Sequence, residues 1–196
     1  MAAEGRKVAI FDQRGAIPEP TREQSPVYTT SELTRELRQG EIISNLVQHV
    51  FDAGKGILAE SLHPLVIVLS QDCDLAQDFD TRQAVNPRPH LNGVLLYEVR
   101  SADDFRRETP ARDLRNPAIK NQIERFHFLE SVPPSLDVVA TGLTEMIIDF
   151  KRFFTVSPTE VYRQFTLKSQ DSAKRRCRLE MPYREHLQAR AAYYFQ

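Results

Sequence analysis

A single stretch near the middle of the chain constrains the fold more than any other feature. Residues 63–74 read His-Pro-Leu-Val-Ile-Val-Leu-Ser-Gln-Asp-Cys-Asp, so an unbroken apolar run is followed at once by polar and acidic residues. A short apolar run rich in β-branched residues is typical of a strand buried on both faces. We therefore expect the polar cluster after Leu69 to lie at the end of a rigid central strand, where a fold holds chemical groups accurately.

The composition limits the class of protein. A length of 196 residues fits one domain of ordinary size, and 41% hydrophobic with 27% charged residues is normal for a globular protein. No apolar run approaches the roughly 20 residues of a membrane-spanning helix, and residues 1–11 lack the apolar core of a secretory signal. The only cysteines are Cys73 and Cys177, which do not make a disulfide scaffold. We therefore expect a cytoplasmic protein with no membrane partner.

The charge is unevenly distributed along the chain. Residues 1–150 hold 16 Lys+Arg against 23 Asp+Glu, whereas residues 151–196 hold 10 against 4. The basic end contains the run Lys174, Arg175, Arg176 and Arg178, which favours an anionic partner there, either RNA or an acidic protein face. The alternative is that these charges only solvate a surface helix and strand.

The pattern of short apolar segments predicts the architecture. Three prolines lie within residues 17–26, so residues 1–29 are expected to form an extended arm before a single domain over 30–196. Strands and helices do not alternate regularly, which disfavours a doubly wound parallel sheet. The sequence predicts a β-rich α+β fold, a small and mostly antiparallel barrel with peripheral helices. The expected elements are strands over 41–47, 65–69, 91–99, 125–129 and 146–156, helices over 31–39 and after Ser157 and Pro182, a loop over 75–90, and a helical or irregular insertion at about 100–124.

Several segments occur in an order that resembles a known family. These are Gly40-Glu41-Ile42, then Pro64–Ser70, then the segment from Gly142 to Ser157 with its Ile-Asp-Phe and Thr-Val-Ser motifs, followed by a capped helix and an amphipathic C-terminal helix. In this order the chain is similar to the MazF/PemK family of toxin endoribonucleases, as a divergent bacterial branch. The resemblance implies an SH3-like barrel, and a role in toxin–antitoxin or other defence systems.

The family's active forms are typically homodimers, so the resemblance also implies a possible homodimer. The last helix carries one apolar face, formed by Tyr183, Leu187, Ala191 and Tyr194. That face would pack either on the chain's own barrel or across a dimer, and the stripe alone does not separate the two.

The chain departs from the family pattern at the positions that matter for catalysis. An arginine commonly precedes the proline of the central strand in that family, whereas His63 stands here. The catalytic threonine of the family has no clear counterpart, and Ser70 occupies the matching strand end. The extension Gln71–Asp74 and the insertion up to about residue 124 are foreign to a minimal toxin. The resemblance therefore implies the scaffold more than the nuclease.

Candidate catalytic residues are chosen by residue type. A metal-free ribonuclease needs a base for the 2′-hydroxyl and cations for the charge on the phosphorane-like intermediate, which His63, His127 and Arg152 would supply. His127 alternates with Phe126 and Phe128, so it is expected to face solvent or a cleft if the two rings face the core. Such chemistry needs no cofactor.

Cys73 is the second candidate, together with Ser70 at the end of the central strand. The carboxylates of Asp72 and Asp74 disfavour a thiolate at Cys73, so nucleophilic chemistry there would need a histidine brought close by the fold. The alternative is a half-buried cysteine whose acidic neighbours cap a turn. No Cys-x-x-Cys or His-x-x-x-His pair fixes a metal geometry, so we expect no metal site.

Three functional hypotheses follow from these residues. The first is an interaction module on a toxin-like barrel, binding a protein or a nucleic acid through Gln71, Asp72, Asp74 and the basic segment 174–178. The second is a metal-independent endoribonuclease with replaced catalytic residues. The third is an enzyme that uses Cys73 with a histidine partner.

Overall fold

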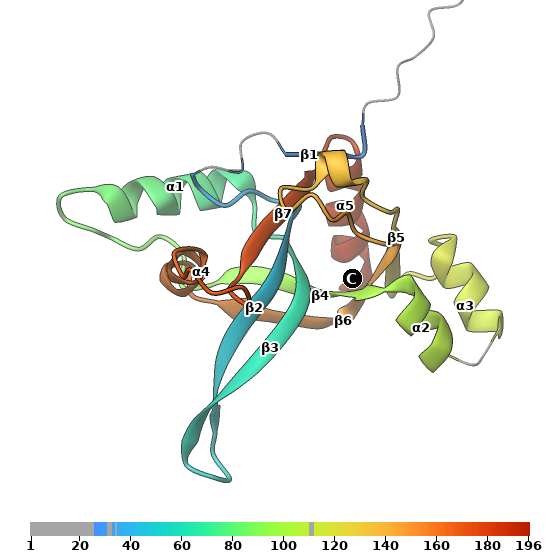
Figure 1. Ribbon diagram of the computed structural model, residues 1–196, viewed down its shortest axis with the longest axis horizontal. Helices are drawn as coiled ribbons and strands as arrows, with labels where there is room; N and C mark the ends of the chain where they lie inside the picture. Colours follow the sequence, from blue (N-terminus) through green and yellow to red (C-terminus); the bar gives the residue numbers. More distant parts are fainter. Residues whose placement is uncertain (1–25, 31–32, 34, 110–111) are drawn as a thin grey trace, which may run out of the picture.

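The computed structural model describes residues 26–30, 33, 35–109 and 112–196 and folds them into an α+β protein around one seven-stranded sheet (Figure 1). Every strand pairing in the sheet is antiparallel. The elements in chain order are β1 (Tyr28–Thr29), β2 (Glu41–Asp52), β3 (Ile57–Val68), α1 (Asp72–Gln83), β4 (Val94–Ser101), α2 (Ala102–Glu108), α3 (Arg112–Ile119), β5 (Phe126–Leu129), the 3-10 helix η1 (Pro134–Leu136), β6 (Met146–Val156), α4 (Pro158–Phe165), β7 (Lys174–Leu179) and α5 (Tyr183–Tyr194).

The sheet is a meander with one returning strand. Its order is β1-β7-β2-β3-β4-β6-β5, so β7 comes back to the side of β2 that β3 leaves free. The register of β4 against β6 shifts between Tyr97 and Val99, where Tyr97 pairs with Phe153 but Val99 pairs with Ile148. Extra residues in one strand bend it at such a point. The predicted α+β class with an antiparallel sheet is confirmed, whereas the sheet stays open and the predicted barrel closure is not.

The core lies on both faces of the sheet. Val66 and Val68 of β3 pack in one cluster with residues of β2, β4 and α4, while Ile67 packs in another with residues of β4, β6 and α5. All three side chains are fully buried. The central strand is therefore buried on both faces, as the apolar run predicts.

Residues 75–90, predicted as a loop, begin within a helix. No glycine or proline interrupts α1, and Asp72 and Asp74 in its first turn suit the positive end of the helix dipole. The loop that follows is held by the buried Asp78, whose carboxylate accepts the backbone N–H groups of His90 and Leu91, each at 2.8 Å. The prediction was wrong because it took a polar composition for a loop, although polar residues also cover the exposed face of a surface helix.

The N-terminal predictions hold only in part. Residues 1–25 of the predicted arm lie outside the described residues, but Tyr28–Thr29 pairs with β7 and so belongs to the sheet. The hydroxyl of the buried Tyr28 donates to the carbonyl of Glu130 at 2.6 Å. The helix predicted over 31–39 begins among residues outside the described set, and residues 35–39 form bends and a turn without a helix.

Most of the remaining predicted elements agree with the structure, but the strands predicted over 41–47 and 65–69 are longer, as Glu41–Asp52 and Ile57–Val68. The insertion at 100–124 contains α2 and α3, and the last helix begins directly after Pro182. Its apolar face packs on the chain's own sheet, because Leu187 and Ala191 are buried in the cluster that holds Tyr97 and Phe150. No helix within the described residues is long and apolar enough to cross a membrane.

Strands β2 and β3 extend far beyond their neighbours in the sheet. β7 pairs with β2 only as far as Ser44, and β4 pairs with β3 only from Val66 onward. The two long strands continue to pair with each other from Val47–Leu62 to Asp52–Ile57, and Figure 1 shows this hairpin projecting away from the rest of the molecule. We call residues 47–62 the hairpin arm.

The end of the arm is a tight turn. The carboxylate of Asp52 accepts the backbone N–H groups of Gly54 and Lys55, and its carbonyl accepts that of Gly56 at 2.8 Å. Gly56 has a φ of 65°, a left-handed conformation that favours glycine. The turn therefore fixes the register of the arm up to its tip.

Candidate functional site

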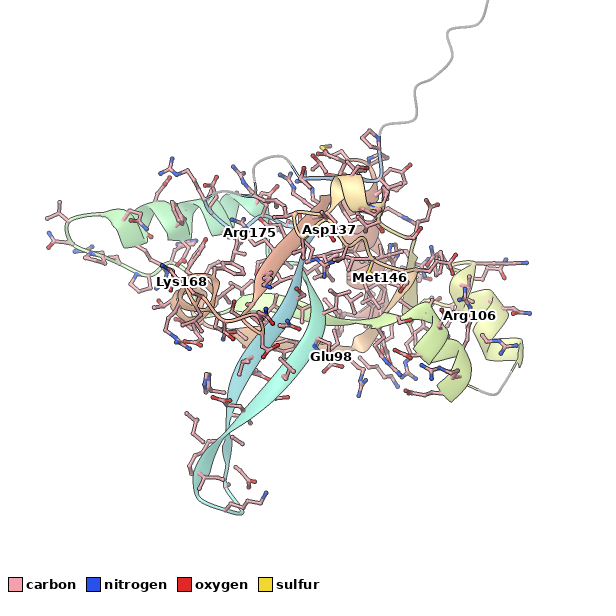
Figure 2. The ribbon with its side chains drawn as sticks, viewed as in Figure 1. Glu98, Arg106, Asp137, Met146, Lys168 and Arg175 are labelled. Atoms are coloured by element: carbon pink, nitrogen blue, oxygen red, sulfur yellow. The ribbon has the colours of Figure 1, made fainter. Side chains whose placement is uncertain are left out.

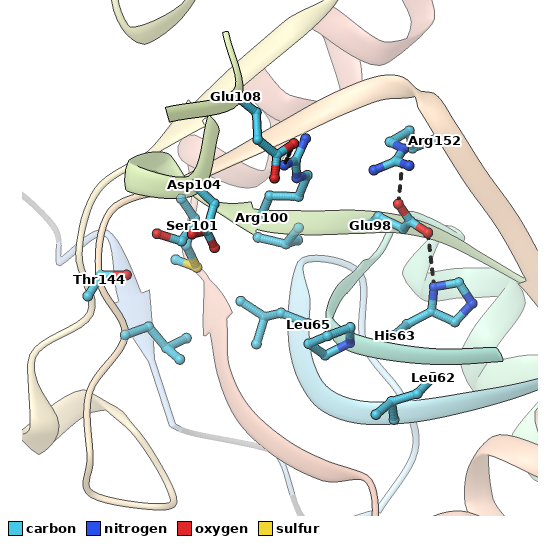
Figure 3. Close-up of a pocket in the computed structure, with 14 residues that line it drawn as sticks. Leu62, His63, Leu65, Glu98, Arg100, Ser101, Asp104, Glu108, Thr144 and Arg152 are labelled. Carbon is cyan, nitrogen blue, oxygen red and sulfur yellow. Dashed lines mark hydrogen bonds and ion pairs between the residues drawn. The ribbon is translucent and has the colours of Figure 1, made fainter. Parts of the chain in front are cut away.

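Two of the predicted catalytic residues, His63 and Arg152, meet on one carboxylate. Nδ1 of His63 on β3 lies 3.1 Å from Oε1 of Glu98 on β4, and Nε of Arg152 on β6 lies 3.2 Å from the second oxygen of Glu98 (Figure 3). The imidazole also stacks on the ring of Phe154, with 3.9 Å between the ring centroids. Glu98, which the sequence did not single out, therefore joins the two.

The surroundings determine the state of His63. Burial lowers the pKa of its imidazole, and the carboxylate of Glu98 opposes that effect. The imidazole is therefore neutral at pH 7, and with Nδ1–H donated to Glu98 its free lone pair is on Nε2. Nε2 is buried and has no hydrogen-bond partner among the described residues. In this conformation the lone pair is oriented by Glu98 but covered by protein.

An open pocket of about 510 Å³ borders this trio. Arg100 on its wall pairs with Glu108 of α2, and Asp104 of the same helix lies beside them (Figure 3). The charged side chains that line the pocket are two arginines and three carboxylates, so the pocket has a small negative excess. It combines a neutral imidazole with arginines whose charges are already matched.

The cluster after the central strand is mostly structural. The hydroxyl of Ser70 accepts the backbone N–H of Leu95 at 2.9 Å, which fastens the strand end to β4. Asp72 accepts the backbone N–H of Gln39 at 2.7 Å and pairs with Arg184 of α5 at 2.6 Å. Asp72 therefore bonds a backbone N–H group, as the structural alternative expects of the acidic neighbours, whereas the half-buried cysteine of that alternative is wrong because Cys73 is exposed.

Cys73 and its remaining neighbours lie on the surface. Cys73 is exposed, and its sulfur lies 3.6 Å from the side-chain oxygen of Gln71 and 3.9 Å from the carboxylate of Asp74. Asp74 in turn lies 3.9 Å from Nε2 of His90. Neither His63 nor His127 belongs to this cluster. Within the described residues, no group of three or more His, Cys, Asp or Glu side chains is placed to hold a metal ion.

His127 does not face solvent, so that part of the expectation is wrong, although it lines a small pocket of about 190 Å³ together with His186. Its side chain is buried, and its ring contacts those of Phe150 and His186. Burial, together with the nearby charge of Arg190, lowers its pKa to about 3. The alternation argument failed because both faces of β5 are covered, one by α5 and the other by the aromatic contact between Phe105 and Phe126. His127 is a neutral core residue.

The basic run lies on β7, where its arginines are matched by carboxylates. Arg175 makes two bonds to the buried Glu41, at 2.8 and 2.6 Å, and Arg176 makes two to the buried Asp137, at 2.8 and 2.7 Å (Figure 2). Arg178 lies 3.7 Å from Asp72. These ion pairs join β7 to distant segments, so the arginines do not form a continuous exposed cationic strip.

Five exposed apolar side chains gather on the hairpin arm, which sequence reasoning missed. The exposed fractions are 64% for Phe51, 65% for Leu58 and 59% for Leu62, with Ile57 at 52% and Val50 at 44%. Phe51 pairs directly with Leu58 across the two strands, so the two side chains share one face of the hairpin. The available signal was the apolar pair on each side of the turn, Val50-Phe51 before it and Ile57-Leu58 after it.

A scan against protein-family models finds no match, and a search of curated proteins finds no relative. The function is therefore inferred from the geometry of the arm and of the pocket.

Proposed function

We propose that this chain is a protein-interaction module that contacts its partner through the hairpin arm. The single observation that carries the proposal is the exposure of Phe51, Leu58 and Leu62 on an element that projects from the sheet. Large apolar side chains exposed together mark surfaces that other proteins cover, because water contact costs about 25 cal/mol for each Å² left exposed. The arm contributes little to the chain's own core, so its apolar face is available for a partner.

A scaffold of the SH3-like type is part of the proposal. It is supported by the strand order β7-β2-β3-β4-β6, a meander whose last strand returns beside the first, and by the shifted register that bends β6 across β4. Closure of such a sheet would produce a small barrel. The resemblance to MazF/PemK toxins supports a role for the module in a bacterial defence or regulatory system.

The chemistry of the arm favours a protein over a nucleic acid. Its charged side chains are Asp52, Lys55 and Glu60, and Lys55 already pairs with Asp52. A phosphate backbone requires several unmatched cations, which this element does not carry. An apolar surface with few charges suits an apolar protein face.

The outer edge of the arm offers a second means of contact. Among the described residues, no strand pairs with the outer edge of residues 57–65 of β3. Unpaired strand edges accept an extended segment of another chain through backbone hydrogen bonds, and neighbouring side chains supply specificity. Partner binding would combine this strand pairing with contacts to the exposed apolar side chains of the arm.

The test replaces the apolar pair at the arm. The double variant F51N/L58N changes only exposed side chains, so the fold should persist, and V85N is the matched control because Val85 is 98% exposed outside the arm. A photo-crosslinker at position 51 identifies the partner in the producing cell, and the purified pair is then measured by calorimetry. We expect F51N/L58N to weaken binding at least about tenfold, which is 1.4 kcal/mol. Equal affinity of F51N/L58N and V85N would refute the proposal.

The trio of His63, Glu98 and Arg152 favours a second candidate, a metal-independent endoribonuclease. Its chemistry would use the neutral imidazole as base for the 2′-hydroxyl, with Arg152 beside the phosphate. It ranks second because Nε2 of His63 is buried and the pocket carries a negative excess toward an anionic substrate. Cleavage would therefore require local opening around His63.

The nuclease is tested on single-stranded RNA in the presence of a metal chelator. Products with 2′,3′-cyclic phosphate ends would support the nuclease if H63Q and R152Q abolish them. The exposed controls H90Q and R107Q should still form these products. Intact RNA with wild-type protein, or full cleavage by H63Q and R152Q, would remove the nuclease candidate.

A further inference from the structure

A second apolar surface lies on the face of the molecule that holds α4 and β7. It is a groove of about 460 Å³ between the segment that links α4 to β7, the start of β7, and the turn after η1. Its volume lies within the roughly 300–1,000 Å³ of known ligand sites. Backbone bonding fixes one wall, because the N–H of Val138 donates to the carbonyl of Arg176 at 2.8 Å. We call it the basic groove.

The floor of the basic groove is apolar. Val138, Val139 and Leu167 line it with exposed fractions of 56%, 37% and 44%, and Phe165 lies beside them. These positions belong to two separate stretches of chain that meet in one hollow. Exposed apolar side chains that converge in a concavity indicate a surface that a partner covers.

The rim of the groove is cationic. Lys168, Lys174 and Arg175 line it, and the lining residues within the described part of the chain include no aspartate or glutamate (Figure 2 labels Lys168 and Arg175). The charge of Arg175 is matched by Glu41, and its guanidinium lies 5.7 Å above the ring of Phe165. Neither lysine forms an ion pair with any described residue. Among the described residues, the two lysines therefore supply the charge on the lining that no carboxylate matches.

We propose that the basic groove binds an acidic segment of a partner protein in which apolar residues alternate with aspartate or glutamate. Carboxylates of that segment meet Lys168 and Lys174, while its apolar side chains cover Val138, Val139 and Leu167. The proposal rests on charge complementarity, since the described residues of the lining combine two lysines that have no ion-pair partner among the described residues with an apolar floor, and include no carboxylate. The residues that line the groove lie outside the hairpin arm, although the base of the arm is close by, where Gln164 of α4 bonds Val47.

The same features disfavour RNA in this groove. Single-stranded RNA stacks its bases on exposed aromatic rings, but the floor is aliphatic apart from Phe165, whose ring already faces Arg175. Two unmatched lysines also neutralise few phosphates. An acidic segment without apolar residues would leave the floor exposed to water, so both features of the partner are required.

Labelled synthetic probes test this inference by fluorescence anisotropy on the full chain. The probes are a peptide of alternating glutamate and leucine, a glutamate–serine peptide, a lysine–leucine peptide and oligouridylate, all of similar length. We expect the glutamate–leucine peptide to bind at least about tenfold more tightly than the others. K168E/K174E and V138N/L167N should each weaken it about tenfold or more, whereas K151E, at an exposed position of β6, and F51N/L58N should not.

Several outcomes would overturn the inference. They are undetectable binding of the glutamate–leucine peptide, equal binding of the glutamate–serine peptide or of oligouridylate, and unchanged affinity in K168E/K174E. Sedimentation analysis tests a further outcome that would overturn the inference. If the chain forms a dimer and K168E/K174E dissociates it, a second copy covers the groove, and not an acidic partner segment.

Discussion

The side-chain amide of Gln164 satisfies both backbone groups of Val47 at the base of the hairpin arm. Its oxygen accepts the N–H of Val47 at 2.9 Å, and its nitrogen donates to the carbonyl of Val47 at 2.7 Å. β7 stops pairing with β2 at Ser44, so the side chain replaces the missing strand at that point. Gln164 therefore connects α4 to the arm.

Replacing Gln164 by alanine should loosen the arm. The substitution leaves two backbone groups without partners, which costs about 1–3 kcal/mol. We expect Q164A to lower the free energy of unfolding by that amount in urea titrations and to speed hydrogen exchange at residues 46–50. Q170A, at an exposed glutamine, should leave both unchanged. Equal stability of Q164A and Q170A would show that water replaces the amide.

The buried pair of Arg176 and Asp137 should hold β7 to the segment after η1. Asp137 also accepts the backbone N–H groups of Thr141 and Gly142, so its carboxylate stays buried and charged if the arginine is removed. Loss of one partner of a buried pair costs about 3–5 kcal/mol. We expect R176A to be destabilised to that extent in urea titrations. The control R163A removes an exposed pair with Glu160 and should cost at most about 1 kcal/mol.

The same pair predicts an acid dependence of stability. Hydrogen bonds and charge from Arg176, opposed by burial, lower the pKa of Asp137 to about 2, below its ordinary value of 3.8. A depressed carboxyl pKa stabilises the fold above the ordinary pKa, and that contribution is lost as the pH falls from about 4 toward 2. The free energy of unfolding of wild type should therefore fall by about 2 kcal/mol more than that of D137N across this window. Parallel curves would contradict the assignment.

Much of the fold was predictable because it depends on local patterns. The apolar run before Ser70 predicts a strand buried on both faces, and Val66 and Ile67 indeed enter opposite core clusters. Long-range relationships were not predictable. Arg175 and Arg176 are neutralised by Glu41 and Asp137, which are far apart in the chain. Nothing in the local sequence of β7 indicates these pairs. The segment predicted as a basic patch is therefore a strand whose arginines are matched by carboxylates.

The candidate site shows the same limit. Residue type identified His63 and Arg152, but the register of β4 is needed to place Glu98 between them. The alternation rule assigned a solvent face to His127, although α5 covers that face through His186. The hairpin arm was missed because the sequence does not show which strands lie beside one another. Whether two strands extend beyond their neighbours depends on the three-dimensional arrangement of the sheet.

The buried His127 should make the free energy of unfolding decrease as the pH falls. An exposed histidine that gains an acidic partner on folding would have the opposite effect. The folded pKa of His127 is about 3, below the ordinary 6.5, so the unfolded chain takes up a proton first as the pH falls. Stability should decline from pH 6.5 toward 3, by up to about 1.4 kcal/mol per pH unit. H127F keeps a ring beside Phe150 and should reduce this slope, whereas H90F at the surface is the control. His63, with its lowered pKa, contributes equally to all three proteins. An unchanged slope in H127F would show that His127 is protonated in the fold.

The two cysteines should differ sharply in reactivity, and this difference tests the cysteine-dependent enzyme. Burial raises the pKa of Cys177 to about 12, whereas Cys73 is exposed beside Gln71 and Asp74. Because Cys73 is exposed, it should react with a disulfide reagent at about the rate of an ordinary free thiol. Native protein should therefore label once, C73S should abolish that labelling, and C177S should keep it. Labelling of Cys73 about a hundredfold faster than glutathione would instead indicate an activated nucleophile and restore the enzyme hypothesis, because such a rate requires a cation near the sulfur.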